Sequence, residues 1–415
     1  TSYTNPRGNT YGISYDSLGR MTNFNNPGSW ADTLVSFSSL GSGLVQTSTR
    51  GNSRVTTTYD GYYRPILVKS EDLTGHSPAR FSKTSYDSMG RTSFSSWPSA
   101  SSNPTAGVNT SYDALGRVTQ PAEPVTPFAT TTTDYLSDNQ VRVTDPVIAQ
   151  TTTTDRAFGS PGTDEAMIVV DATGTTTAMT RDIHGNITNL NQSSGLNGYS
   201  VNVDRKFWYD SRFRLCRHRA PEFGDELFAY DNANQLTMTS RGEAAGSTCG
   251  TPTSTIRTAF TYDAMGRQPL IDFPVGTADI TKTYDANGNL KNVNRGNIIT
   301  AYWYNELDLL GQEYQTHNFR IFTIQHLYDS TGNLSGRVLP GGDTVSFDPN
   351  GFGEKRAIRI GSNNYVSNIA YHPNGAEASA SYGKGKTYAQ TLTKLQKPFD
   401  NIVASSGETA EDHRH

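Results

Sequence analysis

The chain has 415 residues and a net charge of −4; 34% of its residues are hydrophobic, 18% are charged and 10% are aromatic. Its aromatic content and low net charge exclude a disordered polyelectrolyte, and the shortage of charged residues argues against a coiled coil or a helical solenoid. It has no apolar run of about 20 residues, so we expect no membrane span, and no excess of basic charge that would indicate nucleic-acid binding. A turn-rich, all-β protein remains.

One short motif recurs along the whole chain: an aromatic residue, Asp, two variable residues and Gly. We count 17 copies between residues 15 and 371, about one every 22 residues. Clear copies begin at Tyr15, Tyr86, Tyr112, Tyr262, Tyr284, Tyr328, Phe347 and Tyr371, and degenerate copies at Phe37, Tyr59, Tyr135, Asp155, Val170, Arg181, Tyr209, Tyr230 and Tyr304.

Each copy predicts a hairpin turn, because Asp can accept backbone N–H bonds and Gly can adopt positive φ. Asn139, Asn234 and Asp308 replace Gly in three copies, and these residue types tolerate the same geometry. Tyr63 and Phe213 do not fit, and we interpret their turns as reshaped loops. The clearest predicted turn residues are Asp16, Gly19, Asp87, Gly90, Asp113, Gly116, Asp263, Gly266, Asp285, Gly288, Asp329 and Gly332.

Between the turns, alternating segments rich in β-branched residues predict strands, for example at 174–182, 253–263 and 280–285. We expect the motif aromatic to face the residue six positions later across each hairpin, as in Tyr15/Met21, Tyr112/Val118, Tyr209/Leu215, Tyr230/Leu236, Tyr284/Leu290, Tyr304/Leu310 and Tyr328/Leu334. Residues 94–107, 121–130 and 240–255 are predicted loops. The predicted organisation is one β-domain over residues 1–390 and a partly disordered extension over 391–415.

The YD-x-x-G series resembles the YD-repeat (RHS) family, which includes the shell component of bacterial Tc toxins and the shell of teneurins. This resemblance implies tandem antiparallel hairpins in a long spiralling β-ribbon, forming a hollow shell or part of one. It also implies a bacterial protein, secreted or at the cell surface, whose shell encloses a toxic domain or its own tail.

The predicted ribbon is short for a shell of this family. About 34 strands at ~4.8 Å spacing give a ribbon roughly 160 Å long, which is about one open turn of a spiral. We therefore expect a fragment, a subunit of an assembly or a small shell. The first residues lack the features of a secretory signal, and because a repeat begins almost at once we favour an internal piece over a processed N-terminus.

Self-cleaving members of the family carry paired Asp-Pro-x-Gly motifs. Residues 348–351, starting at Asp348, match one of them, whereas His372 replaces the carboxylate in the second candidate, residues 372–375. Both fall in the spacing of the turn repeat, so we interpret both as structural turns.

Cys216 and Cys249 are the two cysteines of the chain. We favour a disulfide between them over two buried thiols, because Cys249 lies in a predicted loop that needs an anchor. Such a bond would close a loop worth about 3–4 kcal/mol and would indicate an exported protein.

A run of basic residues follows the motif at Tyr209. Strand alternation would place Arg212 and Arg214 on one face, and together with Arg217 they could bind phosphate, sulfate or uronate groups. The alternative is pairing with the acidic residues at 222–226. Trp97, in a predicted loop, is a further candidate for sugar contact.

No metal-ligand spacing, catalytic motif or cofactor fingerprint is present in the sequence, and we predict neither a cofactor nor a metal. His317 and His326, near Glu313 and Tyr314, are the least improbable catalytic group. We rank a non-catalytic shell first, with an enclosed toxin or other shell segments as partners. A carbohydrate-binding or adhesion module on surface glycans comes second, and a glycan-degrading enzyme third.

Overall fold

A computed structural model describes residues 1–41, 43–122, 131–157, 165–195, 200–393, 395–405 and 408–414. Its described elements are 36 strands and one short 3-10 turn, and within each of two sheets every strand pairs antiparallel with the next one in sequence. An 11-stranded sheet contains β1 (Ser2–Thr4), β2 (Thr10–Tyr15), β3 (Met21–Asn25), β4 (Thr33–Leu40), β5 (Gly43–Arg50), β6 (Ser53–Tyr59), β7 (Pro65–Asp72), β8 (Arg80–Tyr86), β9 (Thr92–Ser96), β10 (Gly107–Tyr112) and β11 (Val118–Ala122).

A 25-stranded sheet continues the meander. It contains β12 (Thr132–Leu136), β13 (Gln140–Thr144), β14 (Gln150–Asp155), β15 (Ala166–Val170), β16 (Thr176–Arg181), β17 (Ile187–Ser194), β18 (Val201–Tyr209), β19 (Leu215–Ala220), β20 (Gly224–Tyr230), β21 (Leu236–Glu243), β22 (Arg257–Thr261), β23 (Leu270–Asp272), β24 (Ile280–Tyr284), β25 (Leu290–Arg295), β26 (Ile298–Tyr304), β27 (Leu310–His317), β28 (Arg320–Tyr328), β29 (Leu334–Val338), β30 (Thr344–Ser346), β31 (Ile358–Ile360), β32 (Asn363–Tyr371), β33 (Glu377–Tyr382), the 3-10 turn η2 (Gly383–Gly385), β34 (Lys386–Leu392), β35 (Pro398–Ser405) and β36 (Glu408–Arg414). The sheet therefore continues past residue 390, and the division of the chain at that residue stays a prediction.

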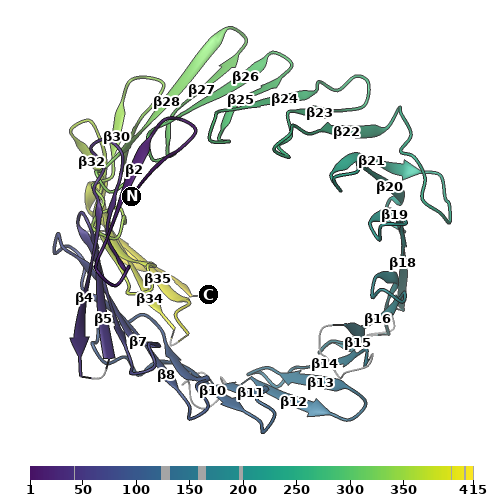
Figure 1. Ribbon diagram of the computed structural model, residues 1–415, viewed down its shortest axis with the longest axis horizontal. Helices are drawn as coiled ribbons and strands as arrows, with labels where there is room; N and C mark the ends of the chain where they lie inside the picture. Colours follow the sequence, from purple (N-terminus) through teal and green to yellow (C-terminus); the bar gives the residue numbers. More distant parts are fainter. Residues whose placement is uncertain are drawn as a thin grey trace.

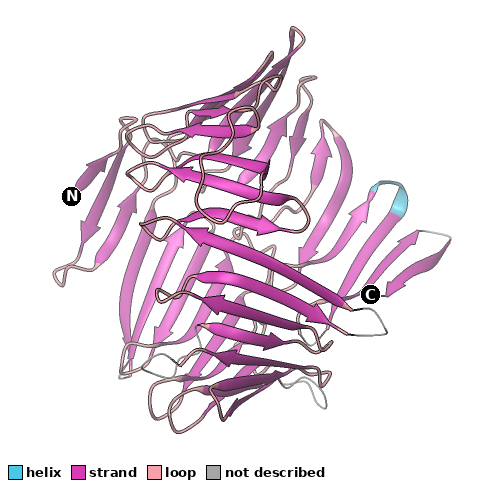
Figure 2. Cartoon of the chain, turned by 90° about the vertical axis from the view of Figure 1, so that its right-hand side faces the viewer, coloured by secondary structure: helices cyan, strands magenta, loops and turns pink. Residues whose placement is uncertain are grey.

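The ribbon follows a ring, and its N-terminal strands overlap its C-terminal third on one side of that ring (Figure 1). The two ends are displaced along the ring axis, with the N-terminal strands at one side of Figure 2 and the C-terminal strands at the other. The ribbon is thus a spiral that passes itself, slightly longer than the single open turn expected from its length. The predicted all-β hairpin ribbon is confirmed.

The cross-strand pairs expected from the repeat are also confirmed. Tyr15 lies opposite Met21, Tyr230 opposite Leu236 and Tyr328 opposite Leu334, and the other expected pairs are in the same register. A register shift immediately before each of these tyrosines marks a β-bulge, which accommodates the five-residue turn that follows.

The ribbon buries few apolar side chains, since a single-layer sheet has no second layer to cover its faces. Among the described residues, the buried hydrophobic ones are Val35, Cys216, Ala220, Leu227, Ala301, Phe347, Ala357 and Ala380. The low apolar content of the sequence is therefore matched by a small core, and the ribbon depends more on backbone pairing and on polar contacts along its edges.

Not every predicted copy forms the expected turn. Phe37 lies inside β4, and the loop of that hairpin comes later, at Gly41. The copy at Tyr135 turns instead through Asp138 and Asn139, with φ of 57° and 54°. Neither copy has Asp directly after its aromatic, so no carboxylate is present to hold the longer turn. The Gly position of the copy at Asp155 lies outside the described residues.

Candidate functional site: the repeat turns and the seam

Most repeat turns lie on one edge of the ribbon, which we call the turn edge; the turns at 145–149 and 171–175 lie on the opposite edge. In a meander, alternate connections lie on opposite edges, so the loops between repeats form the other edge, the loop edge. The turn edge includes residues 16–20, 60–64, 87–91, 113–117, 182–186, 210–214, 231–235, 263–267, 285–289, 305–309, 329–333, 350–354 and 372–376, and the loop edge includes residues 5–9, 26–32, 51–52 and 73–79.

The turn at Asp16 shows how the motif works. Asp16 Oδ1 accepts the N–H groups of Leu18 (2.9 Å) and Arg20 (3.0 Å), and Gly19 N donates to the Asp16 carbonyl at 3.1 Å. Gly19 has φ of 76°, which explains the preference for glycine. The backbone N–H of Arg20, together with its guanidinium, holds the pKa of Asp16 below its usual value. The same cap recurs at Asp87, Asp113, Asp263, Asp285 and Asp329, with Gly90, Gly116, Gly266, Gly288 and Gly332 at positive φ.

Tyr63 and Phe213 adopt this turn as well, so their interpretation as reshaped loops is wrong. Their φ values are 61° and 62°, and their N–H groups donate to the carbonyls of Asp60 and Asp210. The Asp cap imposes the turn even on residues that disfavour it. A turn that the motif search missed, from Asp145 to Ala149, shows the same behaviour, with Ile148 at φ of 68°.

The arginine that follows the glycine position of the motif was not predicted, although the string YD-x-x-GR, which recurs in four copies, offered a signal. Arg64 donates to Asp60 of its own turn at 2.8 Å, and its guanidinium lies over the ring of Tyr86 in the next hairpin, 4.3 Å from the ring centre. Arg91, Arg117, Arg214 and Arg267 make the corresponding contacts with Tyr112, Tyr135, Tyr230 and Tyr284. Each arginine thereby joins two adjacent hairpins.

The motif tyrosines join the same hairpins through hydrogen bonds. The hydroxyl of Tyr86 donates to the carbonyl of Pro65, and that of Tyr112 to the carbonyl of Thr92. Tyr135 bridges the two sheets, since its hydroxyl donates to Val118 O at 3.1 Å. Further bonds of this kind run from Tyr209, Tyr230, Tyr262, Tyr284, Tyr304, Tyr328 and Tyr371.

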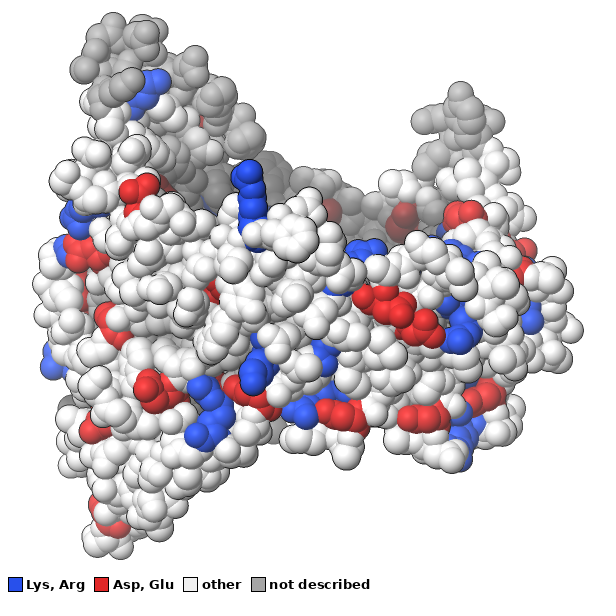
Figure 3. Space-filling view, turned by 90° about the horizontal axis from the view of Figure 1, so that it is seen from above, with Lys and Arg blue, Asp and Glu red and all other residues white. Residues whose placement is uncertain are grey.

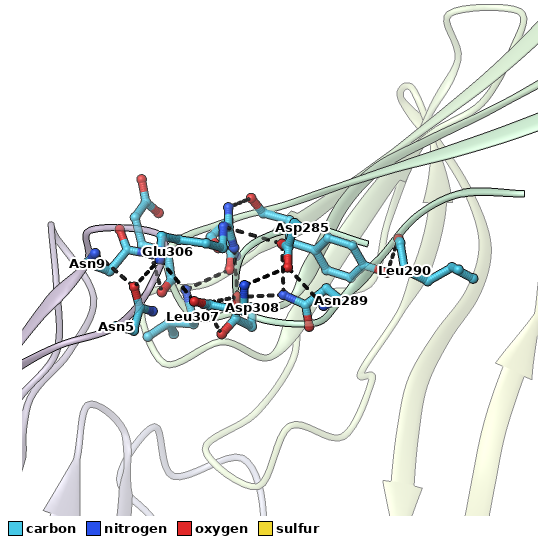
Figure 4. Close-up of polar contacts among 12 residues, drawn as sticks. Asn5, Asn9, Asp285, Asn289, Leu290, Glu306, Leu307 and Asp308 are labelled. Atoms are coloured by element: carbon cyan, nitrogen blue, oxygen red, sulfur yellow. Dashed lines mark hydrogen bonds and ion pairs between the residues drawn. The ribbon is translucent and has the colours of Figure 1, made fainter. Parts of the chain in front are cut away.

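The two overlapping parts of the spiral contact each other along a line that we call the seam. In the seam, loop-edge residues from the first 80 positions contact turn-edge residues 285–354. The contact nearest the N-terminus is made by Arg7. The guanidinium donates to Asn305 O (2.8 Å) and Tyr304 O (2.6 Å) and pairs with Asp308 (2.7 Å). Figure 4 shows this region, with Asn5 and Asn9 facing Glu306, Leu307 and Asp308. Burial raises the pKa of Asp308, but hydrogen bonds from Asn287, Arg7 and Asn289 outweigh it and lower the pKa.

The following loops dock in sequence along the seam. Ala31 N donates to Ser330 O at 2.7 Å, and Trp30 Nε1 donates to Glu306 at 3.0 Å.

At the far end of the seam, Arg80 binds both carboxylate oxygens of Glu354 at 2.7 and 2.8 Å. Gly351 N donates to buried Asp72 at 2.8 Å, and a Cβ at Gly351 would lie 2.1 Å from the carbonyl oxygen of Asn52. This close approach requires glycine.

Asp348 is not the cap of a repeat turn, so its interpretation as one is wrong. Asn350 is the cap: its Oδ1 accepts the N–H groups of Phe352 and Glu354, at 2.9 and 3.0 Å. Asp348 instead pairs with Arg356 at 2.5 Å. His372 does start a repeat turn, with Gly375 N donating to its carbonyl.

Cys216 and Cys249 form a disulfide, with their Cα atoms 5.2 Å apart. It holds the loop between β21 and β22 against β19. Beside it, buried Asp225 pairs with Arg217 and Arg219. The Arg219 side chain, despite burial, lowers the pKa of Asp225 to about 2, with help from Gly246 N and Arg217.

The basic run is divided among separate contacts. Arg212 and Arg214 lie in the turn capped by Asp210, not on one face of a strand, because β19 begins only at Leu215. Arg214 pairs with Asp210, Arg217 with Asp225, and Arg212 donates to Asn232. Binding of an anionic ligand by these residues stays a prediction.

The other candidates lie apart from one another. Trp97 is half-buried in the loop between β9 and β10. His326 Nε2 lies 3.2 Å from Glu313, across the pair β27–β28.

Among the residues that the structure describes, no group of three or more His, Cys, Asp or Glu side chains could hold a metal ion. In the same residues we find no helix with the length and apolarity needed to cross a membrane. Acidic and basic side chains are interspersed over the face visible in Figure 3.

Comparison with solved structures shows where this architecture occurs. The crystal structure of TcdB2-TccC3 without its hypervariable C-terminal region matches 88% of this chain with a TM-score of 0.67 and 12% identity. The crystal structure of TcdB2-TccC3 matches 100% of the chain with a TM-score of 0.64 and 11% identity, and that of TcdB2-TccC3-Cdc42 matches 99% with 0.53 and 12%. No family model and no curated protein matches by sequence.

These likenesses show the fold: the chain is a long ribbon of antiparallel hairpins like that of the TcdB2-TccC3 structures, as the YD repeats predict. The chain spans 22%, 27% and 22% of the lengths of the three solved chains.

Proposed function

We propose that this chain is a non-catalytic wall segment of a shell that encloses or presents cargo, such as a secreted toxin. The observation that carries the proposal is the self-overlapping spiral: a single layer of strands runs around a ring, and the seam joins its first 80 residues to residues 285–354. Such an architecture surrounds a space without filling it. The sequence resemblance and the structural neighbours support a shell, and the disulfide supports an exported protein.

Electron microscopy of negatively stained particles tests the shell directly. We expect class averages of the purified chain to show a ring with a stain-filled centre. A filled particle would refute the proposal.

Enclosure of cargo requires a second measurement. A protease-sensitive passenger peptide fused after residue 415 is compared with the same peptide fused before residue 1. In Figure 1, β34 and β35 lie toward the centre of the ring. We therefore expect slower cleavage of the C-terminal passenger. Equal cleavage of the two passengers would count against enclosure.

A further inference from the structure

The turn edge has two kinds of turn, which differ at the residue four positions after the cap. Six turns outside the seam carry arginine there, at Arg20, Arg64, Arg91, Arg117, Arg214 and Arg267, whereas three others carry Asn186, Gln235 and Ala376. The four turns inside the seam carry Asn289, Leu309, Asn333 and Glu354. Among these turns, none of those that carry arginine is covered by the neighbouring part of the spiral.

Outside the seam, a guanidinium from the preceding hairpin reaches the carbonyl of the next cap. Arg214 Nη1 donates to Asp231 O at 2.8 Å, and Arg267 Nη1 donates to Asp285 O at 3.4 Å. The turn capped by Asp182 lacks an arginine of its own, but Arg156 of the preceding hairpin donates to its carbonyl at 3.1 Å. These contacts are made within one turn of the spiral.

Inside the seam, the guanidinium comes from the neighbouring turn of the spiral. Asn289 donates to the Asp308 carboxylate of the next turn at 2.8 Å, and Arg7 donates to the carbonyl of that turn's cap, Asn305, at 2.8 Å. At the other end, Arg80 pairs with Glu354 and its guanidinium lies over the Phe352 ring at 4.2 Å. In both contacts a guanidinium pairs with a carboxylate of the turn edge, and the arginine comes from 274 to 301 positions earlier in the chain.

We propose that an arginine four positions after the cap keeps a turn out of the seam, so that the neighbouring part of the spiral covers only turns that lack this arginine. An arginine there completes the edge within its own ribbon, whereas Asn289 and Glu354 leave places that fit Arg7 and Arg80. The run of turns without arginine that starts at residue 285, together with the loops that carry Arg7 and Arg80, then sets where the spiral meets itself. This inference concerns ring closure and does not depend on the identity of any cargo.

Hydrogen exchange of the full chain, read by mass spectrometry, tests the proposal at both ends of the seam. E354R places a like charge against Arg80, and N289R brings an arginine that competes with Arg7 for Asn305 O. We expect amide exchange to rise by about tenfold or more in residues 72–80 for E354R and in residues 5–13 for N289R. Q235R is the matched control, because it adds an arginine to an uncovered turn, and it should leave exchange in both loops unchanged.

The double variant R80E/E354R restores opposite charges with the order reversed. It should return exchange in residues 72–80 to within about threefold of the original chain, and this result separates pairing at the seam from a general folding defect. Unchanged exchange in both E354R and N289R would overturn the proposal. So would an opening of the seam by Q235R, or a double variant that stays as exposed as E354R.

Discussion

Replacing Tyr63 by glycine should stabilise the hairpin formed by β6 and β7, although it removes a large side chain. Tyr63 has φ of 61°, in a turn position that other repeats fill with glycine, and its side chain is 72% exposed, so little packing is lost. A left-handed conformation costs a non-glycine residue about 1–2 kcal/mol, and glycine removes this strain. Glycine also has more conformational freedom in the unfolded chain, which lowers the gain in stability by about 0.5–1 kcal/mol. The net expectation is a gain of about 0.5–1 kcal/mol.

The matched control is Gly19→Ala, at the same turn position with φ of 76°. A Cβ there has nothing within 4 Å, so the substitution measures backbone strain alone and should destabilise its hairpin by a similar amount. A ribbon of many hairpins need not unfold in one step, so native-state hydrogen exchange of each hairpin is the suitable assay. A Tyr63→Gly hairpin that exchanges faster than the original would refute the strain explanation.

Three other predictions address the edge contacts and the disulfide region. Tyr112→Phe keeps the ring beneath Arg91 but loses the hydrogen bond to Thr92 O, so hydrogen exchange of this hairpin should show a loss of local stability of about 0.5–1.5 kcal/mol. Tyr112→Leu also removes the ring and should cost more. Equal losses in the two variants would contradict a contribution from the ring. The double variant Cys216→Ser/Cys249→Ser should lower the free energy of unfolding by up to about 3–4 kcal/mol. It should also increase hydrogen exchange in residues 244–256. Unchanged exchange there would contradict the anchoring of this loop by the disulfide. The pKa of Asp225 is lowered to about 2, so its charged form stabilises the fold fully above about pH 4. The free energy of unfolding should fall by about 2–3 kcal/mol as the pH drops toward 2 and Asp225 becomes protonated. Asp225→Asn should remove this part of the acid sensitivity in urea titrations at pH 2–6.

The repeat made much of the fold predictable from sequence. Asp at a fixed distance from Gly or Asn specifies a local turn, and the residues flanking it, such as Tyr230 and Leu236, must then face each other. Contacts within one hairpin depend on short stretches of chain, so their register follows from spacing alone. The same reasoning failed at Tyr63 and Phe213, where residue preference was given more weight than the carboxylate cap.

The candidate site was less predictable, because its contacts join segments that are far apart in the chain. Neither Arg7 nor Glu354 stands out in the sequence, and their loops meet only after the ribbon has passed through nearly 300 residues of spiral. Asp348 was assigned to a repeat turn, whereas Asn350, two residues later, has that role and brings Gly351 against Asp72.

The sequence by itself determined the hairpins, their turns and the order in which they pair, because each of these depends on neighbouring residues. Only the tertiary structure decided how far the ribbon curves before it meets itself, and which of its turns are covered. The curvature of the ribbon is the sum of small rotations between adjacent strands, and this sum cannot be derived from any single motif in the sequence. The seam between Arg7 and Glu354 is the result of that accumulated rotation.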